Sequence, residues 1–220
     1  MIRKIKIVLA LGIGLLMIGC VPMPSKDYTK FREIDPQSIL VVPVVNRSVD
    51  VDAPDYFLST ISRPVAERGY YVFPVNLVKR LLEDEGLSDA FLVHTSDPTR
   101  LAEMFDCDAI FYVTIERWDA RYAVFSTTVT VEFTYLMKSG ETGEELWRHK
   151  EKMVYSPQQQ SSGDPLAGLC VAAIHAAIAK AFPNYIPLTQ QANANAVTRP
   201  HDGLPAGPYA KEYGKDLDKF

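Results

Sequence analysis

The chain has 220 residues and a formal net charge of −4, with 47% hydrophobic and 23% charged residues. This composition can fill the core of one domain and leaves room for shorter flanking segments. Because the chain is mildly acidic and has no basic stripe, it is a poor nucleic-acid binder, and we predict no nucleic-acid partner.

The N-terminal segment has the composition of a secretory signal peptide. Residues 1–6 contain three basic and no acidic side chains, residues 7–18 are apolar or glycine, and Gly19 stands before Cys20. A positive start, a short apolar stretch and a small residue before the cut are typical of a signal peptide. The apolar stretch is shorter than the roughly 20 residues that a membrane-spanning helix needs. We therefore predict residues 1–19 as a signal peptide.

Residues 16–20, with the sequence LMIGC, resemble the lipobox of bacterial lipoproteins, although Met17 stands where that family usually has leucine. The resemblance implies that Cys20 becomes the lipidated first residue, held to a membrane by several acyl chains. In well-studied Gram-negative bacteria, aspartate after the cysteine retains a lipoprotein in the inner membrane. Val21 therefore implies the outer membrane, facing the periplasm. A plain signal peptide that ends in cysteine is the alternative.

The mature chain divides by composition into three segments. Residues 20–37 are polar and flanked by prolines, which predicts a tether. Residues 38–183 carry periodic apolar patterns and form the predicted periplasmic α/β domain. Residues 184–220 are rich in Gln, Asn, Pro and Gly without periodicity, which predicts an extended tail.

The first half of the domain alternates strands and helices. Residues 38–45 are a nearly continuous apolar run, which predicts a strand buried on both faces, and Pro43 lies near its end. Residues 52–69 predict a helix that Pro64 should kink or split. The remaining elements of this half are a short strand and two helices, at residues 70–73, 76–86 and 97–105.

The second half predicts a long antiparallel hairpin. Residues 109–118 are a third buried strand, and residues 122–137 alternate apolar and polar, as a strand with one wet face does. Residues 145–155 return as its partner. A helix that is apolar nearly all round follows over 166–182, and it should be buried on several sides or meet another subunit. The order of elements predicts an α/β fold with a mixed sheet flanked by helices.

Four motifs together resemble a family of uncharacterised bacterial lipoproteins that includes a neisserial genome-derived antigen. They are ERGYYVFPV at 67–75, FDCDAIFYVTI at 105–115, GEELW at 143–147 and GLPAGPY at 203–209. The resemblance covers most of the mature chain. It implies the fold of the amino-terminal domain of TolB and of the periplasmic domain of the curli-secretion channel family, CsgG, and a role in assembly. Cys107 stands where the family commonly has Gly or Ala.

Two cysteines remain once Cys20 is assigned to lipid. The periplasm is oxidising, so Cys107 and Cys170 are candidates for a disulfide. Two separately buried thiols are the simpler alternative. Mass spectrometry with and without reductant separates the two.

The sequence contains no phosphate-binding loop, nucleophile elbow or zinc-protease motif, and its four histidines are widely separated. We therefore predict no catalytic residue, no metal site and no cofactor. Asn46, Arg47 and Asp50 are candidate contacts for a partner or ligand, because ligands favour the carboxyl ends of strands in open α/β sheets. Trp118 and Tyr122 are candidate partner anchors, since aromatic residues are enriched in interface cores. Burial inside the domain is the alternative for these two.

These features predict a lipid-anchored, non-enzymatic envelope protein that serves as an assembly or transport accessory. It would act by self-association or by contact with other envelope lipoproteins, and the resemblance implies CsgG-like ones. A periplasmic module that binds a small ligand or an envelope polymer is the alternative. A hydrolase is a third reading, which the absent motifs disfavour.

Overall fold

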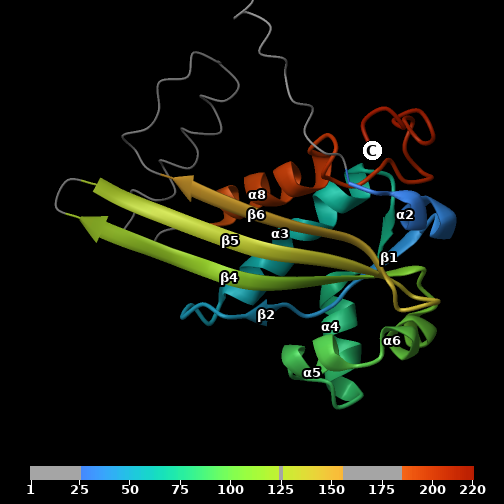
Figure 1. The fold of residues 1–220 in the computed structure, drawn as a ribbon. Helices are drawn as coiled ribbons and strands as arrows, with labels where there is room; N and C mark the ends of the chain where they lie inside the picture. The colour runs from blue at the N-terminus through green and yellow to red at the C-terminus, as the bar shows by residue number, and fades with distance from the viewer. Residues whose placement is uncertain (1–25, 124–125, 156–184) are drawn as a thin grey trace, which may run out of the picture.

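A computed structural model of the chain describes residues 26–123, 126–155 and 185–220 (Figure 1). It confirms the predicted α/β fold with a mixed sheet flanked by helices. The strands β1 to β6 span Ser38–Val41, Val45–Asn46, Tyr71–Val72, Ala109–Ala123, Ser126–Ser139 and Glu145–Tyr155. The described helices α2, α3, α4, α5, α6 and α8 span Thr29–Ile34, Ala53–Glu67, Val75–Asp84, Ala90–Thr95, Pro98–Phe105 and Ile186–Thr198.

The long strand β4 joins the parallel and antiparallel parts of the sheet. β1 lies parallel between β3 and β4, and β2 pairs in parallel with β4 further along that strand. β5 and β6 follow as antiparallel neighbours, which confirms the predicted hairpin. The loop after β2 therefore projects toward the same end of the molecule as the free end of the β4–β5 hairpin (Figure 1).

Helices cover both faces of the sheet near β1 (Figure 1). α3 and α8, with α2 at one end, pack over the larger apolar cluster, and α4, α5 and α6 pack on the opposite face. Successive residues of β1 alternate between the two clusters: Ile39 and Val41 belong to the larger one, and Leu40 belongs to the other. The first strand is therefore buried on both faces, as predicted.

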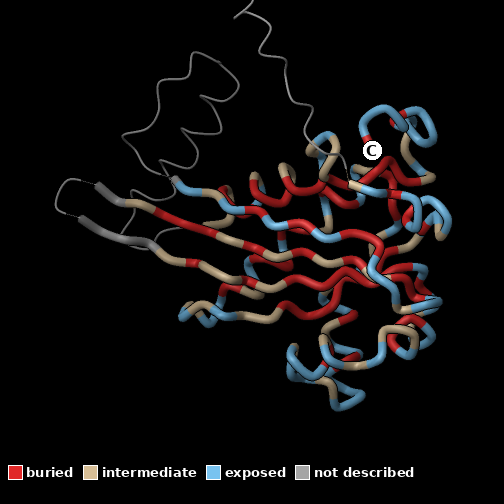
Figure 2. Tube along the Cα trace, viewed as in Figure 1, coloured by how far each residue is buried: buried red, intermediate tan, exposed pale blue. Residues whose placement is uncertain are grey.

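The alternation predicted for β5 is confirmed over its described side chains. The fully buried residues on one face are Val129, Val131, Phe133, Tyr135 and Met137. The intervening side chains are mostly half-buried, and Figure 2 shows the resulting alternation of classes along the strand. The buried face packs against α3, where the rings of Phe57 and Phe133 lie 4.9 Å apart. The hairpin is thus held to the domain mainly by this face, while Leu136 on the other face packs against the apolar cluster beneath α4, α5 and α6.

Two details of the helices differ from the prediction. α3 continues through Pro64, which is buried against the core, so the helix is not split there. Its packing outweighs the one backbone hydrogen bond that proline cannot make. α5 was not predicted, because six residues are too few for a helical period to be visible. Asp89 caps it by accepting a hydrogen bond from the backbone N–H of Phe91.

The tether predicted over residues 20–37 is wrong for its second half. α2 lies within it, and Tyr28 and Phe31 are buried in the larger apolar cluster. The Tyr28 hydroxyl donates a hydrogen bond to the carbonyl oxygen of Gly203, 2.7 Å away. The polar composition of the segment concealed these two aromatic residues, and the ring of Tyr28 packs against Phe220 at the other end of the chain. The described fold begins at Lys26.

The extended tail predicted over residues 184–220 is also wrong, because α8 lies within it and packs on α3 and β6. Its buried face includes Thr189 and Asn193 beside apolar side chains. Asn193 accepts a hydrogen bond from the Tyr135 hydroxyl at 2.6 Å and donates one to the Thr60 hydroxyl at 2.9 Å. Because polar residues interrupt the buried face of α8, its sequence lacks a regular apolar period, and the helix was not predicted. The apolar helix predicted over 166–182 lies outside the described residues.

The rest of the C-terminal segment, residues 199–220, closes over the end of α3. The backbone N–H of Gly207 donates to the carbonyl oxygen of Arg68 at 2.7 Å. A Cβ atom on Gly207 would lie 2.4 Å from the carbonyl oxygen of Gly69, and Gly69 itself has φ +91°. Both positions therefore require glycine for the two segments to meet.

Replacing Leu188 with alanine tests whether α8 belongs to the core. Leu188 is buried in the larger cluster, so the cavity should lower the free energy of unfolding by about 2–4 kcal/mol. Urea denaturation followed by circular dichroism measures this loss. Gln190→Ala, on the exposed side of the same helix, is the control and should change stability little. Equal effects of the two substitutions would contradict the packing of α8.

Candidate functional site

The loop after β2 is held by hydrogen bonds within itself. The side-chain oxygen of Asn46 accepts from the backbone N–H and the hydroxyl of Ser48, at 2.9 and 2.7 Å, and its amide donates to the carbonyl oxygen of Asp50 at 2.7 Å. The Asp50 carboxylate accepts from the backbone N–H of Asp52 at 3.0 Å. These are turns of the kind that Asn and Asp favour. Two of the predicted contact residues, Asn46 and Asp50, therefore shape the loop.

The side chains that this loop presents to solvent are Val49 and Val51, which are 94% and 85% exposed. The predicted contact residue Arg47 lies beside them and pairs with Glu116 on β4 at 3.0 Å. The sequence predicted this loop as a contact site but indicated its polar residues and not its valines. The signal for the valines was their placement between polar residues, in a segment where neither could join a core.

The two predicted aromatic anchors, Trp118 and Tyr122, have different outcomes in the structure. Trp118 is buried, with ring centroids of Phe133 and Tyr185 at 6.2 and 5.2 Å and Tyr56 stacked at 6.3 Å. It is thus part of the core, which was the alternative reading. Tyr122 belongs to β4, but its side chain lies outside what the structure describes.

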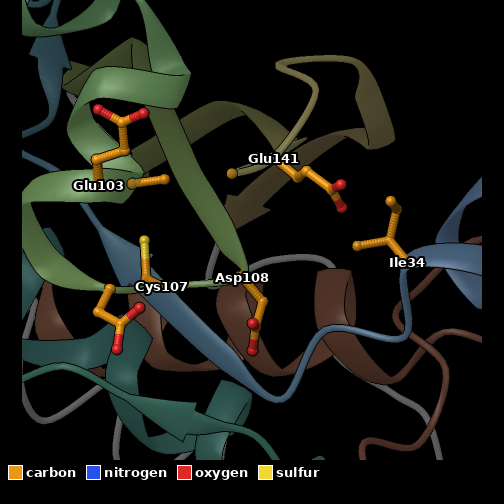
Figure 3. Close-up of a pocket in the computed structure, with 8 residues that line it drawn as sticks. Ile34, Glu103, Cys107, Asp108 and Glu141 are labelled. Atoms are coloured by element: carbon orange, nitrogen blue, oxygen red, sulfur yellow. The ribbon is translucent and has the colours of Figure 1, made fainter.

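A hollow of about 240 Å³ lies beside Cys107, at the amino end of β4 (Figure 3). Four carboxylates line it. Glu103 lies on α6 and Asp106 is the C-cap of that helix, while Asp108 precedes β4 and Glu141 lies in the turn between β5 and β6. The Asp108 carboxylate accepts hydrogen bonds from the backbone N–H groups of Gln37 and Ser38 at 2.9 and 2.8 Å. Asp108 therefore fixes the start of β1. Within the described ranges, no group of three or more His, Cys, Asp or Glu side chains could hold a metal ion.

The thiol of Cys107 is buried and free in the structure. Burial raises the pKa of this thiol to about 12, and the charges of Asp108 and Asp106 add to the rise. A thiol with this pKa is protonated at neutral pH and is a poor nucleophile. Cys170 lies outside the described residues, so the disulfide between Cys107 and Cys170 stays a prediction.

A buried ionic network joins the two ends of the chain to β6. His149 on β6 is buried, with Nε2 3.0 Å from the Glu151 carboxylate and Nδ1 2.7 Å from the Asp202 carboxylate. Arg199 pairs with Glu151 at 2.8 Å, and Lys26 pairs with Asp202. Burial alone would raise the pKa of Asp202, but the Lys26 hydrogen bond and the charges of His149 and Lys26 outweigh it and lower that pKa. His149 therefore lies in the interior between two carboxylates.

His94 ties α5 to the chain between β1 and β2. Its Nε2 lies 3.0 Å from the carbonyl oxygen of Pro43, which can only accept, so this nitrogen carries the proton. The ring packs edge-on against Tyr112 at 5.1 Å. Burial lowers the pKa of His94, the Lys138 charge adds to the lowering, and the Pro43 hydrogen bond opposes it. The surroundings of His94 therefore favour its neutral form.

Comparisons with known proteins identify the family. The family model described as "Putative lipoprotein GNA1162-like" matches residues 26–209. The chain belongs to this family. A relative from Neisseria meningitidis serogroup B, described as "Putative lipoprotein NMB1124/NMB1162", is 32% identical over 187 residues, which cover 84% of this chain and 86% of the relative. The resemblance inferred from the four sequence motifs is therefore confirmed.

The crystal structure of lipoprotein GNA1162 from Neisseria meningitidis resembles the described fold. The two are 32% identical with a TM-score of 0.55, and the match covers 66% of this chain and 99% of the other. The likeness to TolB and CsgG stays a prediction. In the part of the chain that the structure describes, no helix combines the length and the apolar character needed to cross a membrane.

Replacing His94 with glutamine, which keeps a hydrogen-bond donor, tests the role of its neutral form. Because folding lowers the pKa of His94 below the ordinary value of 6.5, the unfolded chain binds more protons below that pH and the wild type loses stability there. The loss can reach about 1.4 kcal/mol per pH unit. Urea denaturation at about pH 7.5 and about pH 5.5 should show a smaller loss in H94Q than in the wild type. Equal losses would contradict the assignment.

Proposed function

We propose that the protein is a lipid-anchored envelope protein that works by binding other proteins and not by catalysis. Its membership of a lipoprotein family supports the anchor. The observation that carries the binding role is the loop after β2, where two valines stand in solvent on a backbone held by its own hydrogen bonds. The proposed partners are further copies of the chain or other envelope lipoproteins, CsgG-like ones among them.

The anchor proposed at Cys20 follows from the signal peptide and the lipobox. Several acyl chains on one cysteine hold a protein to a membrane without a spanning helix. Val21 supports placement in the outer membrane with the domain in the periplasm. The protein would then meet its partners on the membrane surface, where attachment raises their effective concentration.

The loop suits recognition because it is ordered before a partner arrives. Asn46 and Asp50 already satisfy the backbone groups of the turn, so binding costs little conformational entropy. Burying Val49 and Val51 in a partner removes apolar surface from water, which is the main driving force of association. The paired Arg47 and Glu116 beside them would form a polar rim.

The position of the loop supports the same role. In Figure 1, the loop and the free end of the β4–β5 hairpin lie at one end of the molecule. α2, which follows the start of the described chain, and the C-terminus lie toward the other end (Figure 1). An anchor attached near Lys26 would therefore leave Val49 and Val51 facing away from the membrane that holds it, free to reach a partner.

A photo-crosslinking amino acid at position 49 tests the contact in living cells. We expect crosslinks at position 49 to a defined product, either multiples of the chain or another envelope protein, which mass spectrometry identifies. The same amino acid at Leu77, an exposed apolar position on α4, is the matched control and should give none. The same products from both positions, or none from position 49, would count against the proposed contact.

Substituting Cys20 tests the anchor independently. Mass spectrometry of the mature wild-type chain should find an N-terminal peptide that begins with acylated Cys20. Cys20→Ser should remove the acyl chains and release the protein from the membrane fraction. A wild-type chain that begins at another residue, or that carries no lipid, would refute the anchor.

A further inference from the structure

The C-terminal segment exposes three large side chains at four-residue intervals. Tyr209, Tyr213 and Leu217 are 68%, 42% and 63% exposed. Tyr213 and Leu217 line the same hollow, of about 180 Å³, together with Phe31 and Tyr70. We call the three exposed residues the tether-side surface.

The backbone that carries this surface is fixed to the domain. The buried Asp216 carboxylate accepts from the backbone N–H of Ala206 at 2.8 Å and pairs with Arg68 at 3.0 Å. The Tyr70 hydroxyl donates to the carbonyl oxygen of Pro205 at 2.8 Å, and the Tyr213 hydroxyl donates to Asp35. These contacts fix the backbone of the segment, so its exposed side chains are held in one arrangement and cannot turn inward.

The tether-side surface lies where the chain enters the described fold. The backbone N–H of Lys26 donates to the carbonyl oxygen of His201 at 3.1 Å, and the N–H of His201 donates to Lys219 at 2.6 Å. The rings of Tyr28 and Phe220 are 5.9 Å apart. The backbone of His201 thus hydrogen-bonds to both Lys26 and Lys219. Lys219 is two residues beyond Leu217.

The length of chain before Lys26 limits how far this end can lie from the anchor. Five residues lie between Cys20 and Lys26, and the six steps from one to the other span only about 20 Å even when fully extended. That reach is shorter than the domain is long, since the 14 residues of β5 alone span about 45 Å. The end at which the chain enters is therefore the end nearest the membrane. The loop with Val49 lies at the opposite end (Figure 1).

We infer that the tether-side surface rests in the headgroup layer of the membrane that holds the acyl chains, an inference that depends on the proposed lipidation of Cys20. Tyrosine favours this layer because its ring is apolar and its hydroxyl is polar. Leu217 adds apolar area that the layer can bury. Once Cys20 is anchored, the contact is intramolecular in effect, so a small apolar surface suffices to orient the domain.

Charge favours an apolar contact over attraction to anionic lipid. Lysine and acidic side chains alternate along the segment, at Lys211, Glu212, Lys215, Asp216, Asp218 and Lys219. Their charges cancel, so the segment lacks the clustered lysines and arginines that bind anionic lipid. The orientation of the domain should therefore depend little on the content of anionic lipid or on salt.

The test uses the full lipidated chain in vesicles of phosphatidylethanolamine and phosphatidylglycerol. Leu217→Cys and, as control, Val49→Cys are each labelled with an environment-sensitive fluorophore, and the unsubstituted protein gives the background from Cys107 and Cys170. Both substituted positions are exposed, so neither should disturb folding. We expect lipids with a spin-labelled upper acyl chain to quench the label at 217 severalfold more than the label at 49. Aqueous iodide should show the reverse order.

Three outcomes would overturn the inference in distinguishable ways. Vesicles that float with the protein while iodide quenches both labels equally would leave the anchor intact and refute the headgroup contact. A blue-shifted label at 217 that spin-labelled lipid does not quench, and whose shift grows with protein density, would assign the surface to a second copy of the chain. Protein that does not float with the vesicles would refute the anchor, and the contact with it.

Discussion

The packing of the two chain ends against each other closes the main core of the domain. Tyr28 lies between the rings of Phe31 and Phe220, at 6.5 and 5.9 Å, and its hydroxyl reaches the backbone of the C-terminal segment. Beneath this contact, His149 meets a carboxylate at each ring nitrogen. Buried charges of this kind are tolerated when each has a partner, and are costly when one partner is removed. The positions of the chain entry, of β6 and of the C-terminal segment therefore depend on one another.

This closure gives the molecule two different ends. One end gathers the chain entry, α2 and the residues after α8, and the other carries the loop after β2 and the free end of the hairpin (Figure 1). The long strands β4 and β5 run between them, and their buried face is held by α3 and α8. β4 and β5 pair over their described length, so one sheet connects the two ends.

The sequence predicted the elements whose buried residues follow a simple period. The strand at β1 was visible as an unbroken apolar run, and β5 was visible because Val129 to Met137 alternate with polar residues. These patterns depend only on neighbours in the chain. The predicted family resemblance likewise rested on motifs that are each continuous in the chain.

The sequence could not predict the elements that depend on contacts between distant residues. Tyr28 and Phe31 read as part of a polar tether, since the hydrogen-bond and ring partners of Tyr28 are more than 170 residues away and Phe31 packs against Tyr70. Asn193 reads as a break in an apolar pattern until its hydrogen bonds to Tyr135 and Thr60 are seen. At the loop, Asn46 and Asp50 were predicted as contact residues because they are polar and follow the carboxyl end of a strand. Their role in holding the turn, and the exposure of Val49, became apparent only from the fold.

The hydrogen bond between Lys26 and the backbone near Asp202 links residues 176 positions apart. Contacts of such large sequence separation form late and slow folding. The core beside Tyr28 therefore closes only when the segment after α8 is in place to pack against it.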